Sequence, residues 1–243
     1  STSPSFESDS NAHGLLTAAL ERGLVALRES TGPPSKRQAA ETFELRLLST
    51  AYTRCLTVRS AMAIDSSGWL DETKAKLRRG NKVLFDLKNP LFSDLANVIS
   101  HESHKVMVLW ALEFASTAVE TLAERYPDEP RPKVALDKAR AWAAGEVKMR
   151  VARRAILDCH AVAKELDSSV DVALCHAIGQ ACGVVHANGH ALGFPVYELT
   201  AIVLTEGVEN CQEPVERRVA EYLERIDYWR KHLVDYSGTW ADF

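Results

Sequence analysis

The sequence predicts an all-α protein, an antiparallel bundle of about eight to ten helices that forms a single compact unit. Apolar residues recur with the 3.6-residue period of amphipathic helices along almost the whole chain. No stretch shows the sustained alternation of apolar and polar residues that is typical of a strand. Breaks rich in Pro and Gly separate the periodic segments by short connections, which favours antiparallel neighbours.

The N-terminal part of the chain is predicted to be a helical extension, residues 12–100. Residues 1–11 form a polar tail without the basic and apolar regions of a secretory signal, so we expect them to be disordered. The extension is predicted to contain helices over residues 12–29, 36–63 and, more weakly, 70–87. A soft boundary near residues 88–100 then separates it from the helical core, residues 101–243.

The helical core begins with the strongest pattern in the chain, a predicted helix over residues 104–124 whose wide apolar face suits a central position. The segment 126–132 contains three prolines and cannot be helix interior. Four helices are predicted after it, over residues 133–144, 146–166, 170–187 and 190–206, the last interrupted near Pro195. Glu213-Pro214 opens the final helix, whose predicted buried stripe consists of Val215, Val219, Tyr222, Ile226 and Leu233.

Charge and composition argue against two classes of partner, nucleic acids and membranes. The net charge of −4 and the pI near 6.1 argue against a nucleic-acid partner, which usually meets a basic protein face. No apolar run approaches the ~20 residues of a membrane span, so no membrane partner is expected. The five cysteines are odd in number and form no C-x-x-C pair. Since Cys55, Cys159 and Cys182 lie in apolar helical patterns, we interpret them as reduced core residues of a cytoplasmic protein.

Common catalytic motifs do not occur in the sequence. There is no glycine-rich nucleotide loop and no G-x-S-x-G nucleophile turn, so no organic cofactor is predicted. The segment His101-Glu102-Ser103-His104 is one residue short of the H-E-x-x-H zinc motif. The basic run between Lys74 and Lys82 is interpreted as a solvated helix face.

Three histidines are the main candidates for chemistry: His160, His186 and His190. His160 falls on an apolar line of its predicted helix, and His186 shares one side of the next helix with Gly179 and Cys182, so both are expected to face the core. His190 follows His186 by four residues across the pair Asn188-Gly189. Gly179 and Gly183, also four residues apart, are predicted to permit close helix packing.

Three interpretations of these histidines stay open. Each imidazole could be structural and bond a helix-end carbonyl or a neighbouring side chain. The three could instead act as general acid and base, with pKa values lowered by burial, or hold zinc or another divalent metal with one open position. Ligand contacts to such a pocket are predicted for Trp110, Trp142, Gln180 and Tyr197, and supporting roles for Asp158, Glu165 and Glu198.

A longer motif contains a Pro127-Asp128-x-x-Arg131-Pro132 turn, the helix end Ala139-Arg140-Ala141-Trp142 followed by Gly145-Glu146, and His160 in an Ala-rich helix. With these features the chain resembles a known bacterial family, the immunity-protein-five-like family. His186, the segment His190-Ala191-Leu192-Gly193 and the earlier segment LWALEFA over residues 109–115 also fit the family pattern. The resemblance covers about residues 104–233.

The resemblance implies a protein that neutralises a toxin by binding it. The alternative is a small-molecule enzyme without an organic cofactor, an isomerase, cyclase or lyase of a biosynthetic pathway that uses His160, His186 and His190 for acid–base chemistry. The expected partner is therefore either a protein toxin or a small-molecule ligand. A homodimer is compatible with both functions.

Overall fold

The structure is a computed structural model that describes residues 66–241. These residues belong to the second of two compact units of the chain, Ser1–Ala63 and Ile64–Phe243. The all-α prediction is confirmed, because the described part contains eight α-helices, three short 3-10 helices and no strand. The predicted tail, the helices predicted over residues 12–29 and 36–63, and Cys55 lie outside the described residues.

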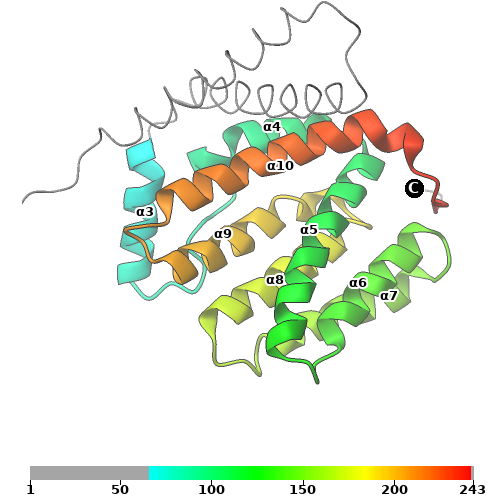
Figure 1. Ribbon diagram of the computed structural model, residues 1–243, viewed down its shortest axis with the longest axis horizontal. Coiled ribbons are helices and arrows are strands. Elements are labelled where there is room, and N and C mark those ends of the chain that lie inside the picture. Colours follow the sequence, from blue (N-terminus) through cyan, green and yellow to red (C-terminus); the bar gives the residue numbers. More distant parts are fainter. Residues whose placement is uncertain (1–65, 242–243) are drawn as a thin grey trace, which may run out of the picture. The chain divides into compact units, whose positions relative to one another are not determined.

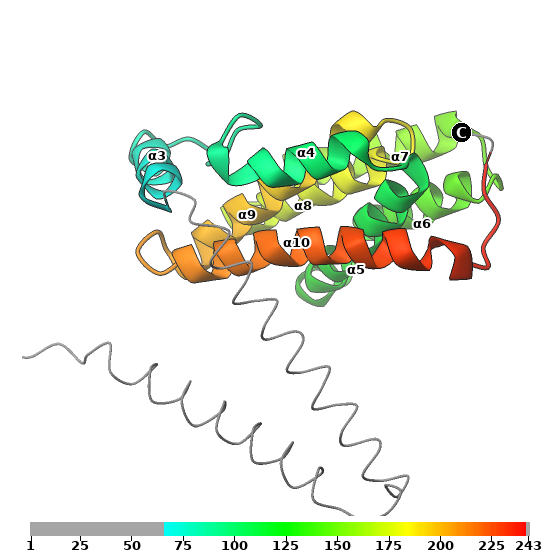
Figure 2. The ribbon, with the colours of Figure 1, turned by 90° about the horizontal axis from the view of Figure 1, so that it is seen from above.

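The helices pack against one another as a bundle (Figure 1). In chain order they are α3 (Ser66–Arg78), α4 (Ser93–His101), α5 (His104–Arg125), α6 (Arg131–Ala143), α7 (Met149–Val162), α8 (Ser169–Gly183), α9 (Gly193–Glu206) and α10 (Gln212–His232). Helix α8 lies among α5, α6, α7 and α9 and contacts all four. Helix α10 runs lengthwise along the bundle and contacts α4, α5 and α9 (Figure 2).

Helix α5 is the most buried long helix of the described part, as its wide apolar face predicts. It begins at Ser103, whose side chain accepts a hydrogen bond from the Val106 amide, a typical N-cap. By length and composition alone α5 could cross a membrane, but 67% of its most apolar window is buried inside the protein. Its apolar character is therefore accounted for by packing against α6, α8 and α10.

An aromatic cluster fills the space between α5, α9 and α10. Trp110, Phe114, Phe194 and Tyr222 lie with ring centroids 5.1 to 6.0 Å apart. The Trp110 indole N–H donates to the Tyr222 carbonyl at 3.1 Å, so the polar atom of this buried ring is bonded within the core.

The predicted helix over residues 70–87 is wrong at both ends. Helix α3 starts earlier, at Ser66, and ends at Arg78, two residues before Gly80, which has φ 72°. Such a left-handed residue is a frequent helix terminator because glycine lacks the Cβ that would clash there. The following residues run without a helix to Asn89, and the Leu84 amide donates to Thr200 Oγ1 on α9 at 3.1 Å.

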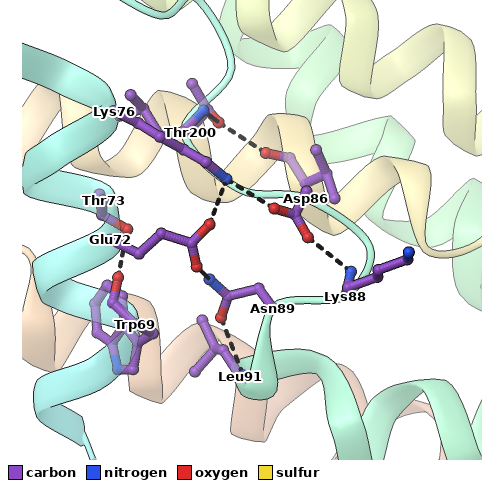
Figure 3. Close-up of polar contacts among 11 residues, drawn as sticks. Trp69, Glu72, Thr73, Lys76, Asp86, Lys88, Asn89, Leu91 and Thr200 are labelled. Atoms are coloured by element: carbon purple, nitrogen blue, oxygen red, sulfur yellow. Dashed lines mark hydrogen bonds and ion pairs between the residues drawn. The ribbon is translucent and has the colours of Figure 1, made fainter. Parts of the chain in front are cut away.

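A polar network fixes α3 to the segment that follows it (Figure 3). Lys76 Nζ lies 2.8 Å from Glu72 Oε1 and 3.0 Å from Asp86 Oδ2. Asn89 donates to Glu72 at 2.8 Å and accepts from the Leu91 amide at 3.1 Å, which starts the turn into α4. Helix α4 was not predicted, and the boundary predicted near residues 88–100 lies inside the second compact unit.

The remaining helix ends differ from prediction by a few residues for local reasons. Gly145 has φ 79° and separates α6 from α7, which begins at Met149. Pro195 does not interrupt α9, because it lies in the first turn, where its missing N–H has no helical partner to lose. Four residues of the predicted α10 stripe are buried, whereas Leu233 follows the helix and is half-exposed.

Candidate functional site

A line of polar and glycine residues along one side of α8 carries the candidate site. His176, Gly179, Gln180 and Gly183 follow one another at spacings of three, one and three residues, which places them on one helical face. Side chains from α7, α9 and the turn after α8 lie against this face. We call the resulting set the histidine band, which consists of His104, His160, His176, Gln180, His186, His190 and Tyr197.

His160 of α7 and His176 of α8 form the first contact of the histidine band. Their Nδ1 atoms lie 3.0 Å apart, so one ring donates its N–H and the other accepts with a lone pair. This arrangement requires at least one neutral ring, since two imidazolium ions have no acceptor between them. The His176 ring also lies 5.1 Å from the ring of Tyr197 on α9.

Two glycines of α8 allow imidazole rings to lie directly on the helix backbone. A Cβ at Gly179 would be 2.4 Å from His160 Nε2, and a Cβ at Gly183 would be 2.9 Å from His190 Cγ. Real Cβ atoms do not make contacts this short, so both positions require glycine as long as the rings stay in place. The space predicted for close helix packing is thus filled by His160 and His190.

His190 is held by Gln180 in the second contact of the histidine band. Its Nδ1 lies 2.8 Å from Gln180 Oε1, and because an amide oxygen only accepts, Nδ1 carries the proton. The Gln180 amide itself lies against Gly193, where a Cβ would be 2.4 Å from Oε1. His190 therefore faces the bundle across the turn, through a side-chain bond to α8.

The prediction that His186 points into the core is wrong. It rests on continuing the helix to residue 187, whereas α8 ends at Gly183 and His186 is exposed. Its ring still lies 5.1 Å from the His190 ring. Nearby, His104 Nε2 lies 2.7 Å from the Val184 carbonyl and satisfies an acceptor at the end of α8.

Burial lowers the pKa of three histidines of the band, His160, His176 and His186. It lowers the pKa of His160 to about 4, and the neighbouring charges of His176 and His190 act in the same direction. Burial also lowers the pKa of His176. For the largely exposed His186 the pKa is lowered first by partial desolvation of the ring and then by the positive charges of His190, Arg153 and His104. At neutral pH these rings are hydrogen-bonding groups rather than cations.

The groups that contact the histidine band do not favour catalysis or metal binding. The bonds of His160, His176 and His190 within residues 66–241 go to one another or to Gln180, not to a carboxylate, the usual orienting partner of a catalytic imidazole. Within the same residues, no group of three or more His, Cys, Asp or Glu side chains is arranged to hold a metal ion. A groove of about 320 Å³ is lined by α5, α8, α9 and α10, and one of about 800 Å³ by α5, α6 and α10. Neither is lined by His160, His186 or His190.

The other predicted ligand contacts are dispersed. Gln180 and Tyr197 belong to the histidine band, whereas Trp110 is fully buried in the aromatic cluster and Trp142 is half-buried on α6. The carboxylates predicted to support the site have other partners. Asp158 pairs with Arg154, Glu165 with Arg131, and buried Glu198 with Arg218 and Tyr222.

Two members of the histidine band were not predicted, His176 and His104. A signal for His176 was present in the sequence, because it precedes Gly179 by three residues and Gln180 by four. His104 meets Val184 across 80 residues of chain, a pairing for which the sequence has no periodic signal. The four described cysteines, Cys159, Cys175, Cys182 and Cys211, are buried and free, and burial raises the pKa of each thiol.

Fold and site together define a helical-bundle protein whose polar cluster lies half-buried along a central helix and outside both grooves. A family model described as Imm-5 like putative immunity protein matches residues 97–225, more than half of the chain, and the protein belongs to this family. The matched residues run from within α4 into α10 and include the whole histidine band. No curated protein and no solved structure matches the chain.

Proposed function

We propose that this protein acts by binding a protein partner, a toxin that it neutralises. Membership of the Imm-5 like family over residues 97–225 is the observation that carries the proposal. The structure supports it through the histidine band, whose rings bond to one another, to Gln180 and to a backbone carbonyl. Two of these rings also lie directly on the α8 backbone at Gly179 and Gly183, which favours a rigid scaffold that presents an outer surface.

The acid–base enzyme is the weaker proposal. It draws support from the convergence of His160 and His176, and of His186 and His190, along α8. Against it, the pKa of His160 is lowered to about 4, far from the neutral value that suits a general base. A buried substrate would also need a cavity at these rings, and neither of the two grooves described above is lined by them.

Co-expression tests the proposal. The candidate toxin is the product of the gene adjacent to the one that encodes this protein, expressed from an inducible promoter with and without the full chain. We expect the toxin to stop growth alone and the full chain to restore it. We also expect the purified pair to elute as one complex in size-exclusion chromatography. A neighbour that is harmless alone, or toxicity that the full chain leaves unchanged, would refute toxin neutralisation.

A further inference from the structure

The charge of the chain is unevenly distributed. Residues 131–162, which form α6, α7 and the turn between them, contain eight Lys and Arg and three Asp and Glu, a net charge of +5. The whole chain has a net charge of −4, so the remaining residues together carry −9. A local excess of this size creates a positive field at one part of the surface, which attracts anionic partners.

The basic residues of α7 gather on its solvent side. Arg150, Arg153, Arg154 and Leu157 are exposed and lie three or four residues apart, within one face of the helix. We call these four residues the α7 outer face. The opposite side of the helix is buried and consists of Ala152, Ala155, Ile156, Cys159 and Val162.

The arginines of the α7 outer face are poorly neutralised. Arg154 pairs with Asp158 at 3.1 Å, whereas Arg150 and Arg153 form no ion pair with any residue between 66 and 241. Helix α10 differs, because its exposed cations Arg217 and Lys231 have intrahelical partners in Glu213 and Asp227. The positive charge of α7 is therefore available to a second molecule.

An apolar residue lies among these charges. Leu157 is 54% exposed, one of the largest apolar exposures in the described part, and Val151 at the flank of the face is 38% exposed. Arginine is enriched at protein interfaces, whose buried centres are more apolar than the rest of the protein surface. The positive charge of Arg153 also contributes to lowering the pKa of His186.

We propose that the α7 outer face docks an acidic surface of the protein partner. The inference rests on the proposed function and names the side of the bundle that performs it. Arginine forks bind the partner's carboxylates, and Leu157 packs against an apolar residue among them. Nucleic acid is a poorer fit, because the α7 outer face has no aromatic ring for base stacking and the rest of the chain is strongly negative.

Charge reversal tests the proposal with the full chain and the toxin encoded by the adjacent gene. The test variant is Arg150→Glu with Arg153→Glu. The matched control is Arg217→Glu with Lys231→Glu, which reverses two exposed cations on α10. Affinity is measured by biolayer interferometry at 50 and 300 mM NaCl. We expect the test variant to bind about 10- to 100-fold more weakly at low salt, through a slower association rate, and the control to bind as wild type does.

The outcomes separate this inference from the function on which it rests. If wild type fails to bind the toxin, the proposed function is wrong. If wild type binds and the test variant binds equally well, toxin binding stands and the α7 outer face is not the docking surface. The wild type is also tested for binding to a 30-base-pair DNA duplex and to anionic phosphatidylglycerol vesicles at 150 mM NaCl. If it binds one of them and the test variant does not, the α7 outer face binds that ligand and not an acidic protein surface. Thermal unfolding of both variants confirms that each is folded.

Discussion

The ring of His160 lies where a side chain at Gly179 would begin, with Nε2 only 2.4 Å from an ideal Cβ. Helices α7 and α8 thus contact each other through the His160 ring and the backbone at Gly179, which has no side chain. The ring cannot simply swing away, because its Nδ1 is bonded to His176. Gly179 and His160 thus depend on each other, and this dependence can be measured.

Gly179→Ala should destabilise the protein by about 1–3 kcal/mol, because the new methyl group overlaps the His160 ring. The double variant with His160→Ala should be more stable than Gly179→Ala alone, since the overlap is removed and alanine favours a helix by up to about 1 kcal/mol. Urea denaturation measures both. Gly68→Ala in α3, where a Cβ meets nothing within 4 Å, is the control. Additive effects of the two substitutions would contradict the packing.

The histidine band should make the protein less stable in acid. The pKa of His160 is about 4 in the folded protein and 6.5 without burial, so the unfolded chain binds the proton more readily between these values. The free energy of unfolding should therefore fall as pH drops from 6.5 to 4 and level off below 4. For a partly exposed ring we expect about 1–2 kcal/mol from His160.

Chemical denaturation from pH 7 to 4 of wild type and His160→Gln isolates this contribution. The variant should show a shallower loss of stability, while the carboxylates and the other histidines titrate in both proteins. The positive charges that oppose protonation here come from α8 and the turn after it, His176 and His190. Parallel pH curves for the two proteins would show that His160 titrates as it does in the unfolded chain.

The buried ion pair between Arg218 and Glu198 should contribute far more to the free energy of unfolding than the exposed pair between Arg217 and Glu213. Glu198 is 4% exposed and accepts from Arg218 at 2.6 and 3.0 Å, with a further bond from Tyr222. Arg218→Met leaves a buried carboxylate without its cation, which should cost about 3–5 kcal/mol. Arg217→Met, in the exposed pair with Glu213, should cost less than about 1 kcal/mol. Similar losses in thermal unfolding would show that the site is well solvated.

Thr200 should be needed to hold the segment after α3 against α9. Its hydroxyl donates to the Val196 carbonyl at 2.8 Å and accepts from the Leu84 amide at 3.1 Å. Thr200→Val keeps the shape but leaves a buried N–H without an acceptor, a cost of about 1–3 kcal/mol. Amide exchange at Leu84 should become faster in the variant. Thr205→Val, which removes a bond only within α9, serves as control and should leave Leu84 protected.

The helices of the core were predictable because burial imposes a 3.6-residue period on the sequence, and α5 to α10 were all expected within a few residues. Helix α4 was missed because its nine residues include only two buried apolar side chains, too few for a period. The predicted orientation of His186 was wrong because α8 ends at Gly183, where the chain turns, although the apolar period of the sequence continues past that residue. The pairing of His160 with His176 depends on the packing of α7 on α8, which no local pattern contains.

The two sides of α7 are subject to separate constraints. Ala152, Ala155 and Cys159 contact the bundle and tolerate little change, whereas Arg150, Arg153 and Leu157 have few contacts within the described chain to lose. Substitutions on the solvent side therefore cost little folding energy. Recognition could diverge there, one residue at a time, while the scaffold is inherited unchanged. The same separation makes α7 the natural helix to randomise when selecting variants that recognise a different partner.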